Sequence, residues 1–319
     1  MMRSFFIYLS KADWARKIIT RWRFAWNLAS RFVAGEKLAD AIQVIRALNA
    51  KGINATLDHL GEHTDSLEAS QAAVRDIIEA LDAIQTSGVR SNVSIKLTQI
   101  GLKIDPKACA ENLRAILTHA RELGNFIRID MEEAAMTQVT LDLLMKMRQE
   151  GFANVGVVIQ SYLYRSEDDV QKLVSRGITV RLCKGAYKEP AEVAYPKKQD
   201  VDAAYDRVTE SLMKGSMALG APAISADGRI PPIPCMATHD PQRIQNAKET
   251  ATRLGLPKDA FEFQMLYGIR RDLQEQLITD GYNVRVYVPY GTEWYPYNMR
   301  RLAERPANVW FIFSNFFRR

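Results

Sequence analysis

Cysteine and histidine are scarce in this chain of 319 residues. The three cysteines, Cys109, Cys183 and Cys235, are widely spaced, form no CxxC pair and leave one thiol over in any disulfide scheme. A disulfide framework is therefore not expected, and a reducing compartment fits best. Of the four histidines, His59 and His63 lie on either side of a strand end and cannot share a helical face, so we expect no metal site.

The chain also lacks the signals of membrane insertion, export and two common enzyme classes. No apolar run approaches the roughly 18 residues that cross a membrane, and residues 1–17 hold no signal-peptide cleavage site. No GxGxxG motif follows a strand, which disfavours a Rossmann dinucleotide site, and there is no Ser-His-Asp or Cys-His signature. We therefore expect a cytoplasmic protein, or one bound peripherally at the inner face of a membrane.

The composition is that of a globular protein with one extensive core, at 47% hydrophobic and 25% charged residues. The net charge of +6 is spread along the chain and not gathered into a tail. This distribution does not imply nucleic-acid binding. It suits an anionic substrate or anionic lipid equally well.

Short runs rich in Val, Ile and Leu alternate with helical patterns from Ala55 onward, which is typical of repeated βα units. Eight alternations predict an α/β fold, a (β/α)8 TIM-type barrel with extra N-terminal helices. We expect a single catalytic domain over 1–319, with helices over 1–52, the barrel over 53–304 and a C-terminal segment over 305–319. The expected strands are Ala55–Leu60, Val93–Leu97, Ile127–Met131, Val155–Gln160, Thr179–Leu182, Pro234–Thr238, Phe261–Met265 and Val284–Val288.

Polar residues gather where these strands end, which is where barrels carry their reactive groups. They include Asp58, Glu62, Lys96, Asp130, Gln160, Arg181, Lys184, Thr238, His239, Gln264 and Tyr287. Such residues are costly to bury unpaired, and their density exceeds what capping of the barrel rim explains.

Three segments carry the most information. In TEWYPYNMRRLAERPAN, the adjacent Arg300 and Arg301 lie on an expected helix, with Glu304 within reach of both. Two guanidinium groups suit a carboxylate, although an Arg-Arg pair alone is more often an exposed basic turn. In VRLCKGAYKEP, small residues after Lys184 would let backbone approach a ligand closely. In ATHDP, the proline can open the next helix.

Read in order, the strand-end motifs resemble the proline dehydrogenase family. These motifs are LDHLGE, SIKLTQIG, IRIDMEE, VVIQSYL, RLCKGAYKEP, ATHDP, FEFQMLYG and VYVPYGTEWYPYNMRRLAERPAN. The resemblance implies a barrel that holds FAD without a Rossmann domain. It implies oxidation of L-proline to Δ1-pyrroline-5-carboxylate by hydride transfer to flavin N5, with electrons passed on to a membrane quinone.

The resemblance also implies roles for single residues. Asp130 and Arg181 would be catalytic. Substrate would be bound by Lys96, Arg300, Arg301, Tyr287, Tyr187, Leu266 and Glu304. The cofactor would be bound by Met131, Val158, Gln160, Arg181, Lys184, Gly185, Ala186, Thr238, His239 and Gln264. Glu62 and Arg300 would pair as a gate when substrate is absent. Asp240 stands where the family commonly has asparagine, so it is not counted as a cofactor ligand.

Two other functions remain open on the residues alone. Lys96 or Lys184 beside Asp130 could form an imine in a Schiff-base lyase, and the arginine pair could serve a protein that only binds carboxylates. The aromatic, basic N-terminus and the C-terminal VWFIFSNFFRR could dock on lipid or cover the barrel. A separate pyrroline-5-carboxylate dehydrogenase would be the partner that consumes the product.

Overall fold

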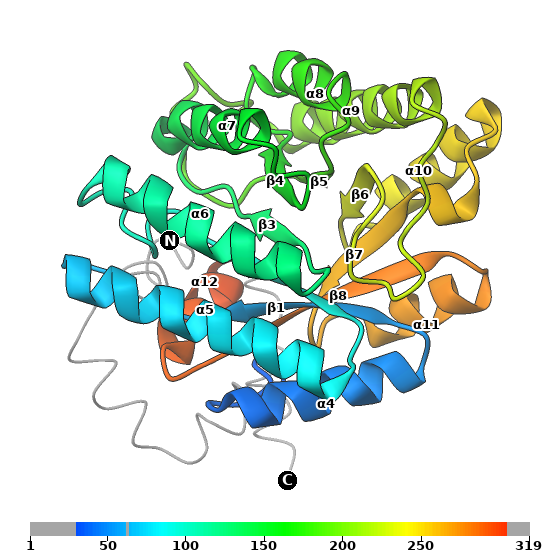
Figure 1. Cartoon of the computed structure of the whole chain (residues 1–319). Coiled ribbons are helices and arrows are strands. Elements are labelled where there is room, and N and C mark those ends of the chain that lie inside the picture. The colour runs from blue at the N-terminus through cyan, green and yellow to red at the C-terminus, as the bar shows by residue number, and fades with distance from the viewer. Residues whose placement is uncertain (1–29, 62–63, 305–319) are drawn as a thin grey trace, which may run out of the picture.

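The computed structural model describes residues 30–61 and 64–304, with the backbone alone for 300–304. Within these residues, eight parallel strands close into a barrel in the order of the sequence, and helices surround it (Figure 1). The predicted fold class is therefore confirmed. The strands are β1 Asn54–His59, β2 Ser91–Ile95, β3 Ile127–Ile129, β4 Val155–Gln160, β5 Val180–Cys183, β6 Pro234–Ala237, β7 Glu262–Leu266 and β8 Asn283–Tyr290.

Strand ends differ from the predicted bounds by no more than two residues, and those of β4 coincide with the prediction. The difference matters most at β2, which was expected to continue to Leu97 but ends at Ile95. The amide of Gln99 donates to the carbonyl of Lys96, and that of Ile100 to the carbonyl of Leu97, so the chain already turns here. Lys96 therefore lies in the turn just beyond the strand, at the mouth of the barrel.

The helices begin and end at capping residues that the sequence carries. Ser66, Asp105 and Asp240 accept backbone amides at helix starts, and Gly88 and Gly255 end helices in the left-handed conformation. The helices are α4 Leu38–Ala50, α5 Leu67–Ser87, α6 Pro106–Glu122, α7 Ala134–Gln149, α8 Ser166–Val174, α9 Lys198–Ala218, α10 Pro241–Leu254, α11 Arg271–Thr279 and α12 Trp294–Glu304, with a 3-10 turn at Lys258–Ala260.

The last helix does not lie on the outer ring of the barrel, and the first helix occupies that position. The helix α4 packs against β1 and β8, the position on the outer ring that a helix following β8 would otherwise take. The helix α12 instead lies near the carboxyl ends of the strands (Figure 1). The predicted N-terminal helices are thus represented by α4, while residues 1–29 and 305–319 lie outside the described part. No described helix has the length and apolar character needed to cross a membrane.

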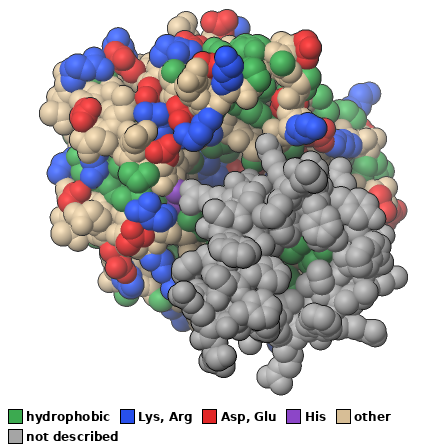
Figure 2. Space-filling view, turned by 180° about the vertical axis from the view of Figure 1, so that it is seen from behind, with side chains coloured by type: hydrophobic (Ala, Val, Ile, Leu, Met, Phe, Trp, Pro, Cys, Tyr) green, Lys and Arg blue, Asp and Glu red, His purple; other side chains and the backbone are tan. Residues whose placement is uncertain are grey.

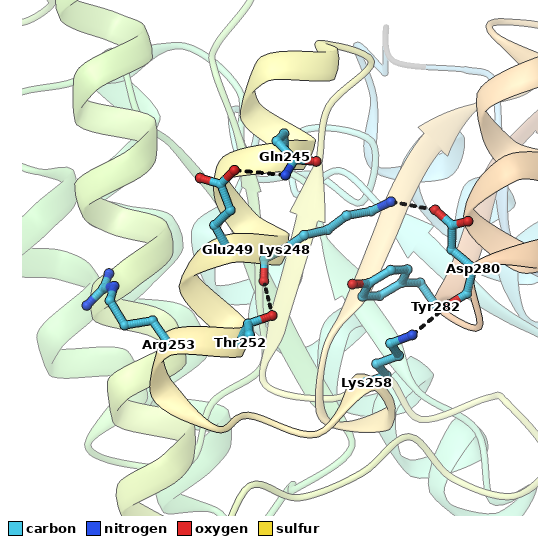
Figure 3. A pocket seen from close by; sticks show the side chains of 8 residues that line it. All are labelled: Gln245, Lys248, Glu249, Thr252, Arg253, Lys258, Asp280 and Tyr282. Carbon is cyan, nitrogen blue, oxygen red and sulfur yellow. Dashed lines mark hydrogen bonds and ion pairs between the residues drawn. The ribbon is translucent and has the colours of Figure 1, made fainter.

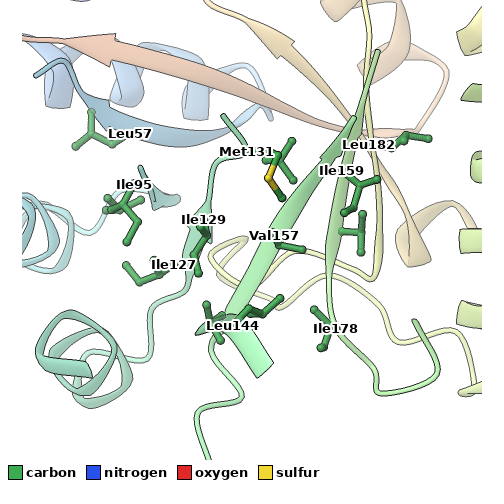
Figure 4. Close-up of a cluster of buried hydrophobic side chains, with 14 of the residues drawn as sticks. Leu57, Ile95, Ile127, Ile129, Met131, Leu144, Val157, Ile159, Ile178 and Leu182 are labelled. Carbon is green, nitrogen blue, oxygen red and sulfur yellow. The ribbon is translucent and has the colours of Figure 1, made fainter. Parts of the chain in front are cut away.

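Each strand alternates between two very different surroundings. Outward-facing residues such as Leu57, Ile95, Ile129 and Val157 are buried against the helices, and Figure 4 shows part of this layer with Leu144 of α7. Most inward-facing residues are polar and also buried, among them Asn54, Thr56, Asp58, Asn92, Ser94, Arg128, Arg181, Glu262, Gln264 and Arg285. The hydrophobic stabilisation therefore lies between strands and helices, while the barrel interior is held by hydrogen bonds and ion pairs.

Two buried arginines occupy the floor of the barrel. Arg285 forms an ion pair with Glu262, at 2.7 Å from Nε to Oε1, and both side chains are almost fully excluded from solvent. Arg128 donates to the carbonyls of Val157 and Thr179. Burial lowers the pKa of Arg128 to about 10, so it keeps its charge at neutral pH.

Gly156 makes room for the Arg128 guanidinium. A methyl group at Gly156 would lie 2.5 Å from the Thr179 carbonyl oxygen and 2.7 Å from Arg128 Nη1. We expect Gly156→Ala to lower the free energy of unfolding by roughly 1–3 kcal/mol, the usual cost of overpacking, as measured by denaturant titration. Gly61→Ala is the control, since its methyl group would meet Gln99 Nε2 at an ordinary 3.8 Å. Equal stability of the two variants would contradict the expectation.

Residues 31–36 form a strap of turns and bends beside the end of β8. The amide of Ala34 donates to the carbonyl of Pro289, and the amide of Gly291 donates to the carbonyl of Gly35. Trp294 Nε1 at the start of α12 donates to Glu36 Oε1 at 3.1 Å. The strap thereby ties the N-terminal part of the chain to the segment that joins β8 to α12.

The outer surface is mixed in charge. Figure 2 shows lysine and arginine side chains interspersed with aspartate and glutamate over the described part of one face. A hollow of about 650 Å³ lies outside the barrel between α10 and the loop before β8 (Figure 3). Its lysines are engaged, because Lys248 pairs with Asp280 and Lys258 donates to the Asp280 carbonyl. None of the predicted site residues lines it.

Candidate active site

Asp130 is the centre of a polar cluster at the carboxyl ends of the strands. Its Oδ1 accepts from Arg181 Nη1 at 2.8 Å and from Ser94 Oγ at 3.2 Å, and its Oδ2 accepts from Tyr287 OH at 2.7 Å. Lys96 Nζ lies 3.9 Å from the same Oδ2. Residues from β2, β3, β5 and β8 thus meet at one carboxylate, as predicted for Asp130, Arg181, Lys96 and Tyr287.

The guanidinium of Arg181 is held on all sides. Its Nε donates to Gln264 Oε1 at 2.5 Å, Nη1 also donates to Ser94 Oγ at 3.0 Å, and Nη2 donates to Thr56 Oγ1 at 3.4 Å. The guanidinium carbon lies 5.2 Å from the centroid of the Tyr287 ring. A planar cation with five donors suits this surrounding as lysine would not. The result is a buried positive charge in a fixed orientation.

Lys96 is anchored chiefly by a residue to which sequence reasoning gave no role. Its Nζ donates to Asp58 Oδ1 at 3.2 Å, closer than its distance to Asp130. The Asp58 side chain is 1% exposed. Asp58 was listed among the polar residues at the strand ends but given no role, and Thr56 and Ser94 were missed, although the alternation of polar residues along Asn54–His59 and Ser91–Ile95 could have indicated an inward polar face.

Tyr287 does more than form the predicted apolar wall, because its hydroxyl donates to Asp130. Burial raises the pKa of Tyr287 well above its ordinary value, and the negative charge of Asp130 adds to the rise. The hydroxyl therefore stays protonated and remains a donor at neutral pH.

Removing the Tyr287 hydroxyl tests this contact. A hydrogen bond to a charged group contributes about 1.5–3 kcal/mol, so we expect Tyr287→Phe to lower kcat/KM by roughly 10–100-fold while the ring still packs below Arg181. Steady-state kinetics would measure the loss. Tyr282→Phe, on the outer surface, should leave kcat/KM unchanged, and a Tyr287→Phe enzyme as active as the parent would show that the contact is dispensable.

Lys184, after β5, lies between two carboxylates. Its Nζ donates to Asp202 and, at 2.7 Å, to Asp240. Burial alone would raise the pKa of Asp202, but hydrogen bonds from Lys184 and Lys198 outweigh it and lower that pKa below its ordinary value. The same balance lowers the pKa of Asp240, which also caps α10 through Gln242. Asp240 thus has structural partners of its own.

His239 and Gln160 border the same mouth. His239 Nε2 accepts from the backbone amide of Leu266 at 2.9 Å, which in the neutral ring leaves the proton on Nδ1. Gln160 ends β4 and is 3% exposed. Its Oε1 has no hydrogen-bond partner among the described residues, which is unusual for a buried acceptor.

Gly185 has an internal reason to be glycine. The sequence suggested close approach of a ligand, but a methyl group at Gly185 would overlap the ring of Tyr162. Its φ of +107° also favours glycine. The packing of Tyr162 is thus one reason for glycine at this position, and the backbone contact of Gly185 with a cofactor stays a prediction.

Comparisons with known proteins show the family of the chain. The profile described as proline dehydrogenase matches residues 41–313. Proline dehydrogenase 2 of Bacillus subtilis is 39% identical over 98% of this chain and 97% of its own length. Proline dehydrogenase of Deinococcus radiodurans is 44% identical over 90% of this chain and 89% of its own length. The chain belongs to the proline dehydrogenase family.

A solved structure supports the shared fold. Proline utilization A (PutA) from Bdellovibrio bacteriovorus matches with a TM-score of 0.78 and 26% identity, covering 87% of this chain and 32% of that protein. This member of the proline dehydrogenase family therefore spans about a third of that longer protein. The family and the enzyme class predicted from the sequence are confirmed.

Some of the remaining predicted residues are described by the structure, and the side chains of the others are not. Met131 and Val158 are buried beside the cluster, Leu266 ends β7, and Thr238 Oγ1 accepts from the amide of Asp240. Ala186 and Tyr187 lie in the loop after β5. Arg300, Arg301 and Glu304 fall on α12, which confirms the predicted helix. Their side chains, and Glu62 of the predicted gate, lie outside the described residues, so the gate and the arginine clamp stay predictions of the proline dehydrogenase resemblance.

Proposed function

We propose that this protein oxidises L-proline to Δ1-pyrroline-5-carboxylate, the first step of proline catabolism, with FAD as its cofactor. The observation that carries the proposal is the cluster of Asp130, Arg181, Lys96 and Tyr287 at the barrel mouth of a proline dehydrogenase family member. The oxidation removes a hydride from the ring carbon next to nitrogen and a proton from nitrogen, leaving a C=N bond. When bound, FAD supplies the acceptor of that hydride at flavin N5.

The residues at the mouth fit a flavin. Gln160 offers a buried acceptor without a protein partner among the described residues, and Lys184 has three donors of which two are directed at Asp202 and Asp240. His239 is held in one tautomer by the Leu266 amide. Together with Met131, Val158, Gly185, Ala186, Thr238 and Gln264, these residues would hold the cofactor.

The charges of the cluster account for orientation and rate. A buried cation such as Arg181 stabilises negative charge that develops on a reduced flavin. Lys96, together with Arg300 and Arg301 on α12, would bind the substrate carboxylate and fix the ring in place. Asp58 and Asp130 would hold the Lys96 ammonium group in position for that carboxylate. Tyr287, Tyr187 and Leu266 would exclude water from the ring.

The reaction also requires an acceptor for the electrons of the reduced flavin and an enzyme that consumes the product. We include a membrane quinone as electron acceptor, with peripheral contact at the inner face of the membrane through the basic, aromatic termini. The Escherichia coli relative, named as bifunctional protein PutA, is matched over 24% of its length. We also include a separate pyrroline-5-carboxylate dehydrogenase as the partner that consumes the product.

Anaerobic titration of the purified protein with L-proline tests the proposal. A flavin absorption band that bleaches on adding proline is the expected result. A colourless protein that FAD cannot reconstitute would overturn the cofactor. Borohydride trapping of a substrate on Lys96 or Lys184 would instead identify the Schiff-base alternative, which leaves the contacts of Arg181 without a role.

A further inference from the structure

A line of hydrogen bonds runs through the barrel interior from Arg181 to the floor. Arg181 Nε donates to Gln264 Oε1, and Gln264 Nε2 donates to Glu262 Oε1 in a short contact. Glu262 in turn accepts from Arg285 Nε at 2.7 Å and from Arg285 Nη2 at 3.1 Å. The four side chains are between 0% and 7% exposed, so water does not replace any of these bonds.

The chemistry of the groups fixes the direction of this line. A guanidinium only donates and a carboxylate only accepts, so Gln264 between them must turn its oxygen to Arg181 and its amide nitrogen to Glu262. Within the described residues, Arg181 and Glu262 are the two groups that bond to this side-chain amide. Glu262 therefore holds the amide nitrogen of Gln264, while Arg181 bonds to its oxygen.

The lower end of the line is rigid. Arg285 also donates to the carbonyls of Ala55 and Gly228, each at 2.8 Å, and so is fixed to the main chain. The neighbouring Arg128 on the same floor donates to the carbonyls of Val157 and Thr179 and to Cys235 Sγ. Arg128 thus belongs to a separate network that makes no hydrogen bond to Gln264 or Arg181 in the described structure.

We propose that Glu262 and Arg285 are positioning residues that hold the guanidinium of Arg181, through Gln264, at its place beside Asp130 and over Tyr287. Neither touches the reacting atoms, and their effect reaches the mouth through one amide. The inference rests on the proposed function, because a displaced Arg181 matters to catalysis only if a flavin binds beside it.

Glu262→Met is the first test. Methionine offers Gln264 Nε2 no strong acceptor and leaves Arg285 without its counter-ion, so nothing below Gln264 holds the amide that accepts from Arg181. We expect the anaerobic rate constant for flavin reduction by proline to fall about a hundredfold, as for a misplaced catalytic group. The equilibrium constant for flavin reduction, measured by redox titration without proline, should fall about tenfold, as for one charge-assisted hydrogen bond.

A second variant guards against failure to fold. Glu262→Met leaves Arg285 without its counter-ion, whereas the double variant Glu262→Met/Arg285→Met removes both charges, which proteins often tolerate. The same two readouts should fall in the double variant, because the amide of Gln264 is no longer oriented from below by a carboxylate. Arg128→Met is the matched control, since it removes a buried arginine from the same floor and should lower Tm while leaving both flavin readouts within about twofold of the parent.

Crystal structures of the cofactor-free variants separate this inference from the proposed function. We expect the contact between Arg181 Nη1 and Asp130 Oδ1 to be lost in the double variant and kept in Arg128→Met. An unmoved guanidinium, with flavin readouts like those of the control, would overturn the positioning role. Failure of the proposed function would appear separately, as a parent protein that takes up no FAD or is not bleached by proline.

Discussion

Replacing Arg181 with lysine is expected to slow flavin reduction by proline about a thousandfold. The removal of one preorganised donor costs about 10²–10³ in rate, and here the donors to Gln264 and Thr56 are lost together with the planar fit to Asp130. Lysine keeps the positive charge but carries it on a single ammonium group at the end of a flexible side chain. Stopped-flow absorbance under anaerobic conditions would measure the rate constant.

An exposed arginine provides the control for this substitution. Arg176 Nη1 donates only to the nearby carbonyl of Lys172 on the surface, and Arg176→Lys should leave the rate unchanged. If Arg181→Lys slowed reduction less than about tenfold, the orientation of the guanidinium would be unimportant. Its charge alone would then account for the role of Arg181.

Replacing Lys96 with methionine is expected to weaken proline binding about a hundredfold and also to destabilise the fold. The substitution removes a cation for the substrate carboxylate and leaves Asp58 as a buried charge, and breaking such a pair costs roughly 3–5 kcal/mol. The proline Kd from equilibrium titration of the flavin spectrum and the free energy of unfolding would report the two effects separately.

The double variant Lys96→Met/Asp58→Asn distinguishes the two effects of Lys96. Neutralising Asp58 removes the unpaired charge, so most of the stability should return while proline binding stays weak. Recovery of binding together with stability would mean that Lys96 acts through the fold and not on the substrate. The variant Asp58→Asn alone should affect the proline Kd less, because the amide oxygen can still accept from the ammonium.

The sequence predicted the barrel because its outward strand residues are apolar and recur at regular intervals. It also placed Asp130, Arg181 and Lys96 together, since the carboxyl ends of parallel strands share one face. It did not predict that Thr56, Ser94 and Gln264 contact Arg181. Those contacts cross the barrel between strands distant in sequence, and they depend on the register and closure of the sheet, which local patterns do not encode.

Two residues show why single-residue interpretations stayed incomplete. Gly185 was interpreted as an opening for a ligand, and its missing side chain also accommodates the ring of Tyr162. Tyr287 was assigned to an apolar wall, yet its hydroxyl belongs to the Asp130 cluster. In both cases the decisive partner comes from another βα unit, and only the folded chain brings the two together.

The strap beside the end of β8 and the pairing of β1 with β8 have a consequence for synthesis on the ribosome. Ala34 bonds to Pro289, and the register joins Asn54–His59 to residues 285–290, so neither contact can form until nearly the whole chain has emerged. At a translation rate of about 5–20 residues per second, the edge of β1 that pairs with β8 stays unpaired for on the order of 10–50 s. During that interval its backbone can pair with another nascent chain, and we expect chaperones to raise the yield of folded protein mainly by covering this edge.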